Sequence, residues 1–195
     1  MQEKPDKAEM RILEAAIACI EEYGLHGTTI RRIAAKASVN TAAINYYFRT
    51  KEQLLDRVME LTLNNAFDWS DLTDTENLPP KERLLSIIRH LNAGAQHFPE
   101  LCRAHFDETI VNGNYDTRSI TRLNEFMEQL FRELKGKGCT MSDEELKFSI
   151  EQVFVAGIFG AGMMPGVSRS FLGLDLTRES ERERYLRHLV DRLMD

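Results

Sequence analysis

The sequence predicts an all-α protein of about nine helices, because apolar residues recur with a helical period of about 3.6 along almost the whole chain. No useful length alternates polar and apolar residues, as a half-buried strand would. Near the N-terminus, two short helical segments are separated by only a few residues, which is typical of a helix-turn-helix unit. We therefore expect an N-terminal three-helix domain of this kind and a second helical domain after it.

Composition allows a folded protein with a hydrophobic core. The chain has 195 residues, 43% of them hydrophobic, which suffices for one large or two small domains. The first apolar segment contains acidic residues, unlike a secretory signal, and the weakly polar run at 153–166 is too short and glycine-rich to span a bilayer. The three cysteines are far apart. We expect reduced thiols and a cytoplasmic protein that does not bind membranes.

Charge is distributed unevenly along the chain. The net charge of −6 argues against a protein coated in nucleic acid. Residues 26–51, however, contain no acidic residue, and their basic residues are Arg31, Arg32, Lys36, Arg49 and Lys51. An acidic chain thus has one basic segment that could meet an anion.

The first two helices are defined by their apolar stripes and by their ends. A helix over residues 7–23 would bury a stripe that includes Leu13 and Ile20, and Gly24 would end it in a left-handed cap. Thr28 or Thr29 would then N-cap a second helix of barely two turns.

A third helix is predicted over residues 41–48, with Asn40 as its N-cap. At about 100° per residue it has two arcs. The inner arc contains Ala43, Ile44, Tyr47 and Phe48, and the outer arc contains Thr41, Ala42, Asn45 and Tyr46. A capping box of Thr50 and Gln53 would then open a fourth helix that runs towards Trp69.

The remaining chain alternates helices and breaks. Residues 70–80 are predicted as a loop, since polar turn-forming residues lead into a double proline. Further helices are expected over about 80–97, 99–112, 116–135, 142–164 and 178–194. A capping box at Ser142 opens the long one, and Pro165-Gly166 ends it.

The outer arc of the third helix has the chemistry to read DNA. Thr41, Asn45 and the Tyr46 hydroxyl can hydrogen-bond base edges in a major groove, and Ala42 permits close approach. Phosphates could be met by the side chains of Arg31, Arg32, Lys36 and Lys51. The helix starts at Thr28 or Thr29 and at Lys51 add backbone donors for anions.

Residues 8–54 resemble the DNA-binding domain of the TetR family of transcriptional regulators. The resemblance rests on Tyr23-Gly24, Thr28-Thr29, Ile33-Ala34, Val39, Tyr47-Phe48 and Lys51-Glu52-Leu54. It implies that Thr28 or Thr29, Tyr47 and Lys51 hold phosphates, and that Thr41, Ala42, Asn45 and Tyr46 face bases. Because Tyr47 is on the inner arc, we expect its ring to pack and only its hydroxyl to reach DNA. Ser38 and Asn40 depart from the family, which often has glycine in the turn and serine at the cap.

The resemblance also implies a division into a DNA-binding domain, residues 1–54, and an effector-binding and dimerisation domain, residues 55–195. Small residues at spacings of three and four in the long helix permit close helix packing. With the last helix they would form the interface of a homodimer, through Ala156, Gly157, Gly160, Ala161, Tyr185 and Leu189. Packing within one chain, a glycine hinge or a ligand wall are alternatives for the same glycines.

The effector pocket is expected among the helices of 80–135 and the start of the long helix. Its candidate residues are His90, His97, Arg103, His105 and Glu108, which could equally face solvent. Cys102 and His105, at i and i+3, could share a metal, and Cys19 or Cys102 could be a redox switch, but neither pattern is strong. No metal site or cofactor is predicted.

The function that these features favour is a ligand-responsive regulator of transcription. It would be a dimeric repressor, released from a palindromic double-stranded operator by an unknown small molecule; an activator or a metal or redox sensor on the same fold are alternatives. An enzyme is not expected and no catalytic residues are predicted, because the chain lacks a nucleophile motif, a phosphate loop or paired carboxylates. A binding module that has lost DNA binding is a third hypothesis.

Overall fold

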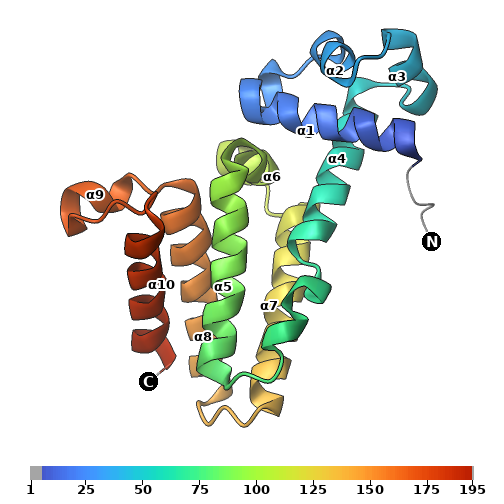
Figure 1. Ribbon diagram of the computed structural model, residues 1–195. Coiled ribbons are helices and arrows are strands. Elements are labelled where there is room, and N and C mark those ends of the chain that lie inside the picture. The colour runs from blue at the N-terminus through green and yellow to red at the C-terminus, as the bar shows by residue number, and fades with distance from the viewer. Residues whose placement is uncertain (1–5, 195) are drawn as a thin grey trace.

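The computed structural model describes residues 6–194, apart from the side chain of Asp71. Its first helices form an N-terminal domain at the top of the molecule (Figure 1). They are α1 (Lys7–Gly27), α2 (Ile30–Ala37) and α3 (Thr41–Tyr47). Helix α4 (Lys51–Ala66) starts in this domain and runs down into the second one.

The second domain is a bundle of helices below the first (Figure 1). After a 3₁₀ segment, η1 (Trp69–Thr75), come α5 (Pro80–His97), α6 (Pro99–Asn112), α7 (Arg118–Gly136) and α8 (Asp143–Phe154). A π-helical segment, η2 (Val155–Met163), continues α8, and α9 (Val167–Leu172) and α10 (Glu179–Met194) complete the chain. The described residues contain ten α-helices and no strand, which confirms the all-α prediction.

The predicted N-caps at Asn40, Thr29 and Ser142 are confirmed and explain where their helices begin. The Asn40 side chain accepts from the Ala43 backbone N–H at 2.7 Å, and Thr29 caps α2 in the same way. Ser142 and Glu145 form the reciprocal capping box. At α4, the Thr50 hydroxyl accepts from the Gln53 backbone N–H. The Gln53 side-chain oxygen accepts from the Arg49 backbone N–H, whereas a capping box would use the N–H of Thr50.

Two helix boundaries differ from the prediction. Gly24 has φ 70°, but one more turn follows it, so α1 continues past this kink to Gly27. The segment predicted as a loop at 70–80 begins with the 3₁₀ turns of η1, whose Trp69 ring stacks on Phe126 at 4.6 Å between centroids. This aromatic packing orders a segment whose polar composition predicted only a loop.

Two hydrophobic cores correspond to the two domains. The upper core is built from residues between Ile12 and Val58, and the lower core from residues between Leu63 and Val190. One residue crosses this division: Leu101, in the first turn of α6, is buried in the upper core. Phe106, on the same helix, is buried in the lower core. Helix α6 is therefore part of both.

The long C-terminal helix was predicted as continuous α-helix, but its second half is π-helical. Two amide side chains of α5 explain the difference. Asn92 donates to the Gly157 carbonyl at 2.6 Å, and Gln96 donates to the Ala161 carbonyl at 2.8 Å. These contacts satisfy carbonyls of the wider turn, and three glycines in the segment lower the strain of forming it.

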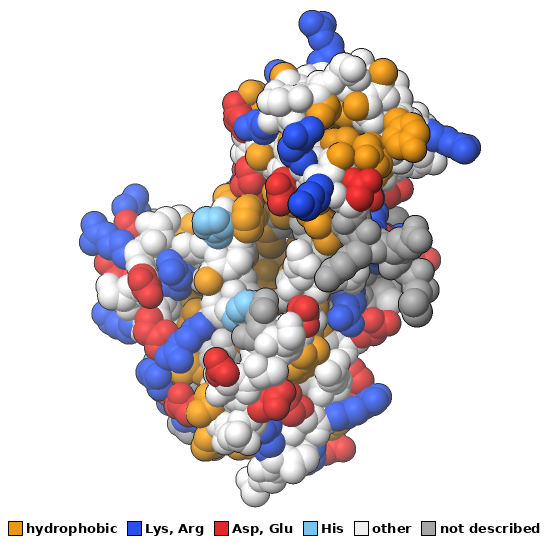
Figure 2. Space-filling view, turned by 45° about the vertical axis from the view of Figure 1, so that its right-hand side comes forward, with side chains coloured by type: hydrophobic (Ala, Val, Ile, Leu, Met, Phe, Trp, Pro, Cys, Tyr) orange, Lys and Arg blue, Asp and Glu red, His pale blue; other side chains and the backbone are white. Residues whose placement is uncertain are grey.

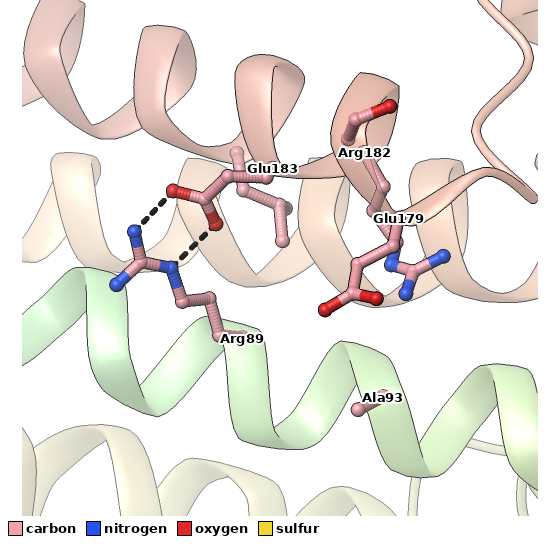
Figure 3. A pocket seen from close by; sticks show the side chains of 7 residues that line it. Arg89, Ala93, Glu179, Arg182 and Glu183 are labelled. Atoms are coloured by element: carbon pink, nitrogen blue, oxygen red, sulfur yellow. Dashed lines mark hydrogen bonds and ion pairs between the residues drawn. The ribbon is translucent and has the colours of Figure 1, made fainter.

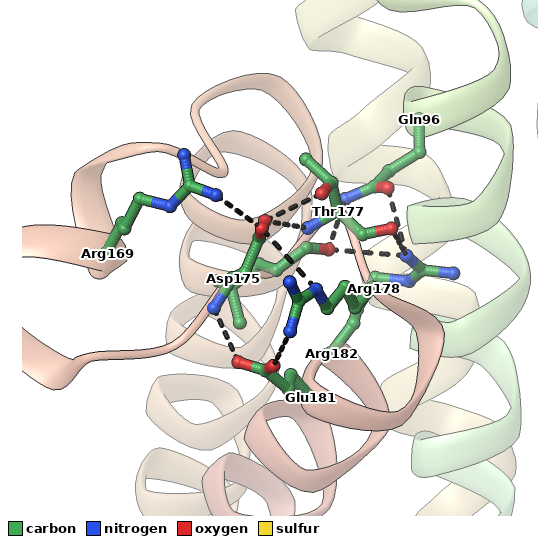
Figure 4. A network of polar contacts seen from close by, with 8 residues as sticks. Gln96, Arg169, Asp175, Thr177, Arg178, Glu181 and Arg182 are labelled. Atoms are coloured by element: carbon green, nitrogen blue, oxygen red, sulfur yellow. Dashed lines mark hydrogen bonds and ion pairs between the residues drawn. The ribbon is translucent and has the colours of Figure 1, made fainter.

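A polar network holds α9, which the sequence did not predict, and the turn that follows it (Figure 4). The Asp175 carboxylate accepts from Arg169 at 2.6 Å and from the Thr177 hydroxyl at 2.6 Å. Arg182 donates to the Gln96 side-chain oxygen at 3.0 Å and so joins this turn to α5. The network fixes the start of α10 against the bundle.

The stretch Asp143–Met163 is long and apolar enough, by length and composition, to cross a membrane. However, 56% of its apolar window is buried inside the protein. This stretch corresponds to α8 and η2, whose residues Val153 and Ala161 are fully buried in the lower core. The helix is apolar because it forms the centre of the bundle.

Gly157 tests this packing. A Cβ atom at Gly157 would lie 2.5 Å from Cγ1 of the fully buried Ile88. We predict that Gly157→Ala lowers the free energy of unfolding by about 1–3 kcal/mol through overpacking, measured by urea denaturation. Gly94→Ala is the matched control, since no atom lies within 4 Å of the place that its methyl group would take. Equal stability of the two variants would contradict the packing described here.

Candidate nucleic-acid interface

Helices α2 and α3 form a helix-turn-helix, and Ser38 makes the turn between them. Ser38 has φ 54° and ψ 44°, the left-handed conformation, which glycine adopts with less strain than serine. The Ser38 and Val39 N–H groups donate to the carbonyls of Ala35 and Ala34, as in a Schellman motif. The turn thus satisfies the end of α2 and redirects the chain into α3.

The two arcs of α3 lie as the helical wheel predicted. On the inner side, Ile44 and Phe48 are buried in the upper core, with 0% and 6% of their surface exposed. On the outer side, Tyr46 is 83% exposed, and Thr41, Ala42 and Asn45 are exposed as well. The helix therefore presents a narrow surface of small and polar groups plus one tyrosine.

The basic side chains around this helix are of two kinds. Lys36 is held by Glu22 at 2.7 Å, and this hydrogen bond raises the pKa of Lys36 and lowers that of Glu22. Arg32 lies 4.0 Å from the centre of the Tyr23 ring and donates to the Gly27 carbonyl. Within residues 6–194, three others make no side-chain hydrogen bond or ion pair: Arg31, Arg49 and Lys51. Figure 2 shows Lys and Arg side chains projecting from the top and edges of the upper domain.

The two threonines before α2 have different roles. Thr28 is 0% exposed, and its hydroxyl donates to the Gly24 carbonyl at 2.8 Å. The expectation of a phosphate contact from its side chain is corrected, because this hydroxyl cannot reach the surface. Thr29 is exposed, and its hydroxyl oxygen caps α2 by accepting from the Arg32 N–H at 3.3 Å.

Tyr47 is half-buried, and its hydroxyl emerges beside the start of α1. Its ring contacts Tyr46 edge-on at 5.2 Å between centroids and Phe48 at 6.4 Å. The hydroxyl donates to the Asp6 carboxylate at 3.1 Å. Sequence reasoning missed Asp6; the spacing Asp6 to Glu9 signals a helix cap, but nothing local indicates a contact 41 residues away.

The candidate effector residues are not brought together. Of the five, His97 is exposed beside Phe98, Arg103 pairs with Glu100, and Glu108 accepts from Asn112 on the surface. His90 is half-buried on α5. His105 is also half-buried, and its ring nitrogens contact side chains of α4 and α7.

His105 is part of a chain of hydrogen bonds through the lower domain. The Thr62 hydroxyl donates to the Val58 carbonyl at 2.9 Å, so it accepts from Nε2–H of His105 at 2.9 Å. Nδ1 is then an acceptor for the Ser119 hydroxyl at 3.3 Å. Burial lowers the pKa of His105 to about 4, which keeps the ring neutral.

The thiols offer little support for a metal or redox sensor. Burial raises the pKa of Cys102 to about 11, so the thiol is protonated at neutral pH, and burial also raises the pKa of Cys19. His105 is committed to Thr62 and Ser119 rather than to Cys102. Among the described residues, no group of three or more His, Cys, Asp or Glu side chains could hold a metal ion.

The six candidate dimer residues divide by the side of the helix on which they lie. Gly157 and Ala161 are buried against the bundle of their own chain, which agrees with the alternative of packing within one chain. The expectation that these two residues contact a partner subunit is therefore corrected. Ala156, Gly160, Tyr185 and Leu189 are half-buried. On the outer side of α8 and η2, Phe148 is 58% and Val155 48% exposed. The outward stripe therefore begins earlier than the sequence suggested.

Two open grooves lie outside the helix-turn-helix. One runs between α5 and α10, where Arg89 makes a two-pronged ion pair with Glu183 and Glu179 lies beside Arg182 (Figure 3). The other lies where the two domains meet, lined by α1 and by His97 and Phe98. In the first groove Arg89 pairs with Glu183, and Arg182 donates to the Gln96 side-chain oxygen and the Leu176 carbonyl, so both cations already have partners.

Fold and surface together define a two-domain helical protein that presents a helix-turn-helix. The family described as "Bacterial regulatory proteins, tetR family" matches residues 12–58, which make up most of the N-terminal domain. The regulator PksA of Bacillus subtilis is 32% identical over 83 residues, and a BetI regulator of Pectobacterium carotovorum is 34% identical over 82. These matches span 43% and 40% of this chain, and only 40% and 42% of the two relatives.

Solved structures show that the likeness in fold extends over both domains. The fatty acid degradation regulator FadR from Bacillus halodurans has a TM-score of 0.70 at 18% identity, covering 98% of this chain and 97% of its own. A TetR transcription regulator from Haloarcula marismortui has a TM-score of 0.66 at 22% identity, covering 96% of both chains. The whole chain therefore has the tetR fold, including the C-terminal bundle.

Ser38 gives a direct test of the turn. A non-glycine residue in the left-handed region is strained, and the family often has glycine there. We predict that Ser38→Gly raises the free energy of unfolding by about 1 kcal/mol, after allowance for the greater flexibility of unfolded glycine. Ser38→Ala should show no gain, since alanine retains the strain. Thermal unfolding followed by circular dichroism would compare them, and a destabilised Ser38→Gly would contradict the turn geometry.

Proposed function

We propose that this protein is a dimeric, ligand-responsive transcriptional repressor that binds a palindromic operator and is released from it by a small molecule. This function would place the protein in the cytoplasm, where the DNA is. The observation that carries the proposal is the outer surface of α3, where Thr41, Ala42, Asn45 and Tyr46 are all exposed on the second helix of a helix-turn-helix. Such a helix fits a major groove, where these side chains would meet base edges.

The basic side chains on either side of α3 would meet the phosphates. Arg31 lies in the first turn of α2, and Arg49 and Lys51 directly follow the C-terminal end of α3. Within residues 6–194 these three side chains have no acidic partner to displace. The starts of α2 and α4 add backbone N–H groups. These contacts would give affinity without sequence preference.

Dimerisation would place two copies of α3 on successive turns of one DNA face, about 34 Å apart. We assign the interface to the outer side of α8 with η2 and of α10. Phe148, Gln152 and Val155 follow one another at helical spacing there, and the first and last are large apolar side chains in solvent. Tyr185 and Leu189 lie half-buried on the neighbouring α10.

The effector would act on the lower core beside His105. Through Thr62 and Ser119, this residue joins α4, α6 and α7, and α4 continues directly into the DNA-binding domain. A ligand that separated these helices would change the direction of α4 and therefore the spacing of the two recognition helices. Each 1.4 kcal/mol of preference for one spacing changes DNA affinity about tenfold.

Two substitutions on the DNA-facing side should have different effects. We predict that Asn45→Ala lowers the preference for an operator selected from random duplexes by about 1–3 kcal/mol, because it removes a base contact. Lys51→Ala should weaken binding to every sequence and lower the salt slope by about 1, because it removes a phosphate contact. Gel-shift titrations at several salt concentrations measure both.

Matched controls are available elsewhere on the chain. Asn64→Ala removes an exposed asparagine of α4, and Lys147→Ala removes an exposed lysine of α8. Neither should alter operator preference or the salt slope. If the native chain retained no DNA from the random pool at any salt concentration, the proposed function would be refuted.

A charged substitution at Val155 tests the proposed dimer interface. We predict that Val155→Glu converts a dimer into monomers, because the carboxylate would be desolvated at the apolar contact, while the monomer fold is unchanged. Val111→Glu is the control, since Val111 is 68% exposed at the far end of α6. Sedimentation velocity distinguishes the two states. A Val155→Glu chain that remains dimeric would move the interface elsewhere.

A further inference from the structure

The Tyr47 hydroxyl is committed to Asp6 when no DNA is bound. Asp6 is the N-cap of α1: one carboxylate oxygen accepts from the Ala8 and Glu9 N–H groups, each at 2.8 Å. The other oxygen accepts from the Tyr47 hydroxyl at 3.1 Å. Figure 1 shows the start of α1 lying beside α3, which places this pair at the edge of the recognition helix.

A tyrosine hydroxyl has one proton to donate. It can be given to Asp6 or to a DNA phosphate, but not to both in the same geometry. A phosphate oxygen that took the place of the carboxylate oxygen would also approach a negative charge, because Asp6 is ionised. The hydrogen bonds that the Asp6 carboxylate accepts, first of all from the Glu9 N–H, lower the pKa of Asp6. The hydrogen bond between Tyr47 and Asp6 raises the pKa of Tyr47.

We propose that Asp6 acts as an internal substitute for a DNA phosphate at Tyr47 and lowers the affinity of the domain for DNA of every sequence. This inference rests on the proposed function. Asp6 is a positioning residue: its cap to α1 fixes the carboxylate, and the packed ring of Tyr47 fixes the hydroxyl, so the two meet without reorganisation. DNA binding then requires the hydroxyl to exchange one acceptor for another.

The variant Asp6→Asn separates the charge from the cap, because asparagine caps helices as well as aspartate does. We expect it to melt at the same temperature and to bind a labelled duplex of mixed sequence, and the selected operator, about three- to fivefold more tightly at low salt. The gain should shrink as salt is added, since the charge is exposed.

Glu14→Gln is the matched control. It removes the same charge from an exposed position of α1, about two turns further along and away from Tyr47. In a Tyr47→Phe background the gain from Asp6→Asn should be smaller than in the native chain, since only the relief of charge repulsion remains and no hydroxyl has to exchange its acceptor. An Asp6→Asn chain that binds no better than Glu14→Gln, or binds more weakly, would overturn the proposal and leave the proposed function intact.

A second measurement does not depend on DNA. With ring-labelled tyrosine, an NMR titration should show a Tyr47 pKa above the ordinary value in the native chain, and a lower one in Asp6→Asn, with Tyr46 unchanged. A Tyr47 pKa that does not respond to Asp6→Asn would overturn the contact itself. If the Tyr47 pKa responds to Asp6→Asn but no variant binds any duplex, both the proposed function and the role of Asp6 in DNA affinity are refuted. The hydrogen bond between Asp6 and Tyr47 would then still be supported.

Discussion

The start of α6 is the constraint on which the relation between the two domains depends. This helix begins at Pro99 without a side-chain cap of its own, and the Glu21 carboxylate of α1 accepts from the Leu101 N–H at 2.7 Å. The carboxylate also stabilises the positive end of the α6 dipole. Because Leu101 is buried in the upper core and Phe106 in the lower one, α6 cannot shift without disturbing both.

The hydrogen bonds of His105 make a second connection between the domains. They join α6 to α4 at Thr62 and to α7 at Ser119, within an otherwise apolar core. Each member of this chain has a partner, and an unpaired member in such surroundings would be costly. The arrangement therefore has one favourable geometry, which fixes the direction in which α4 leaves the lower domain. Helices α4 and α6 together set the position of the upper domain.

The sequence predicted the features that arise from local contacts. Asn40, Thr50 and Ser142 cap helices within three residues of themselves, so their helix starts could be read from spacing. The π-helical segment could not, because its cause is Asn92, 65 residues from the Gly157 carbonyl. The contact of Tyr47 with Asp6 also spans a long stretch of sequence, 41 residues. In the same way, small residues predicted close helix packing correctly, but only the fold shows that Gly157 faces its own chain.

The contacts on the DNA-facing side have a consequence for regulation. Lys36 pairs with Glu22, Arg32 contacts Tyr23 and the Gly27 carbonyl, and the Tyr47 hydroxyl donates to Asp6. Part of the hydrogen-bonding and positive surface is therefore already in use within the protein before DNA binds. Exchanging such contacts weakens operator and non-operator binding alike, since phosphates are the same in both. The ratio of the two affinities, which determines operator choice, is preserved. In the proposed repressor, a lower absolute affinity for DNA would mean that the effector needs a smaller difference in affinity between the two protein states to cause release. Under the proposed repressor function, Glu22 and Asp6 would therefore favour release at a given effector preference, without loss of sequence discrimination.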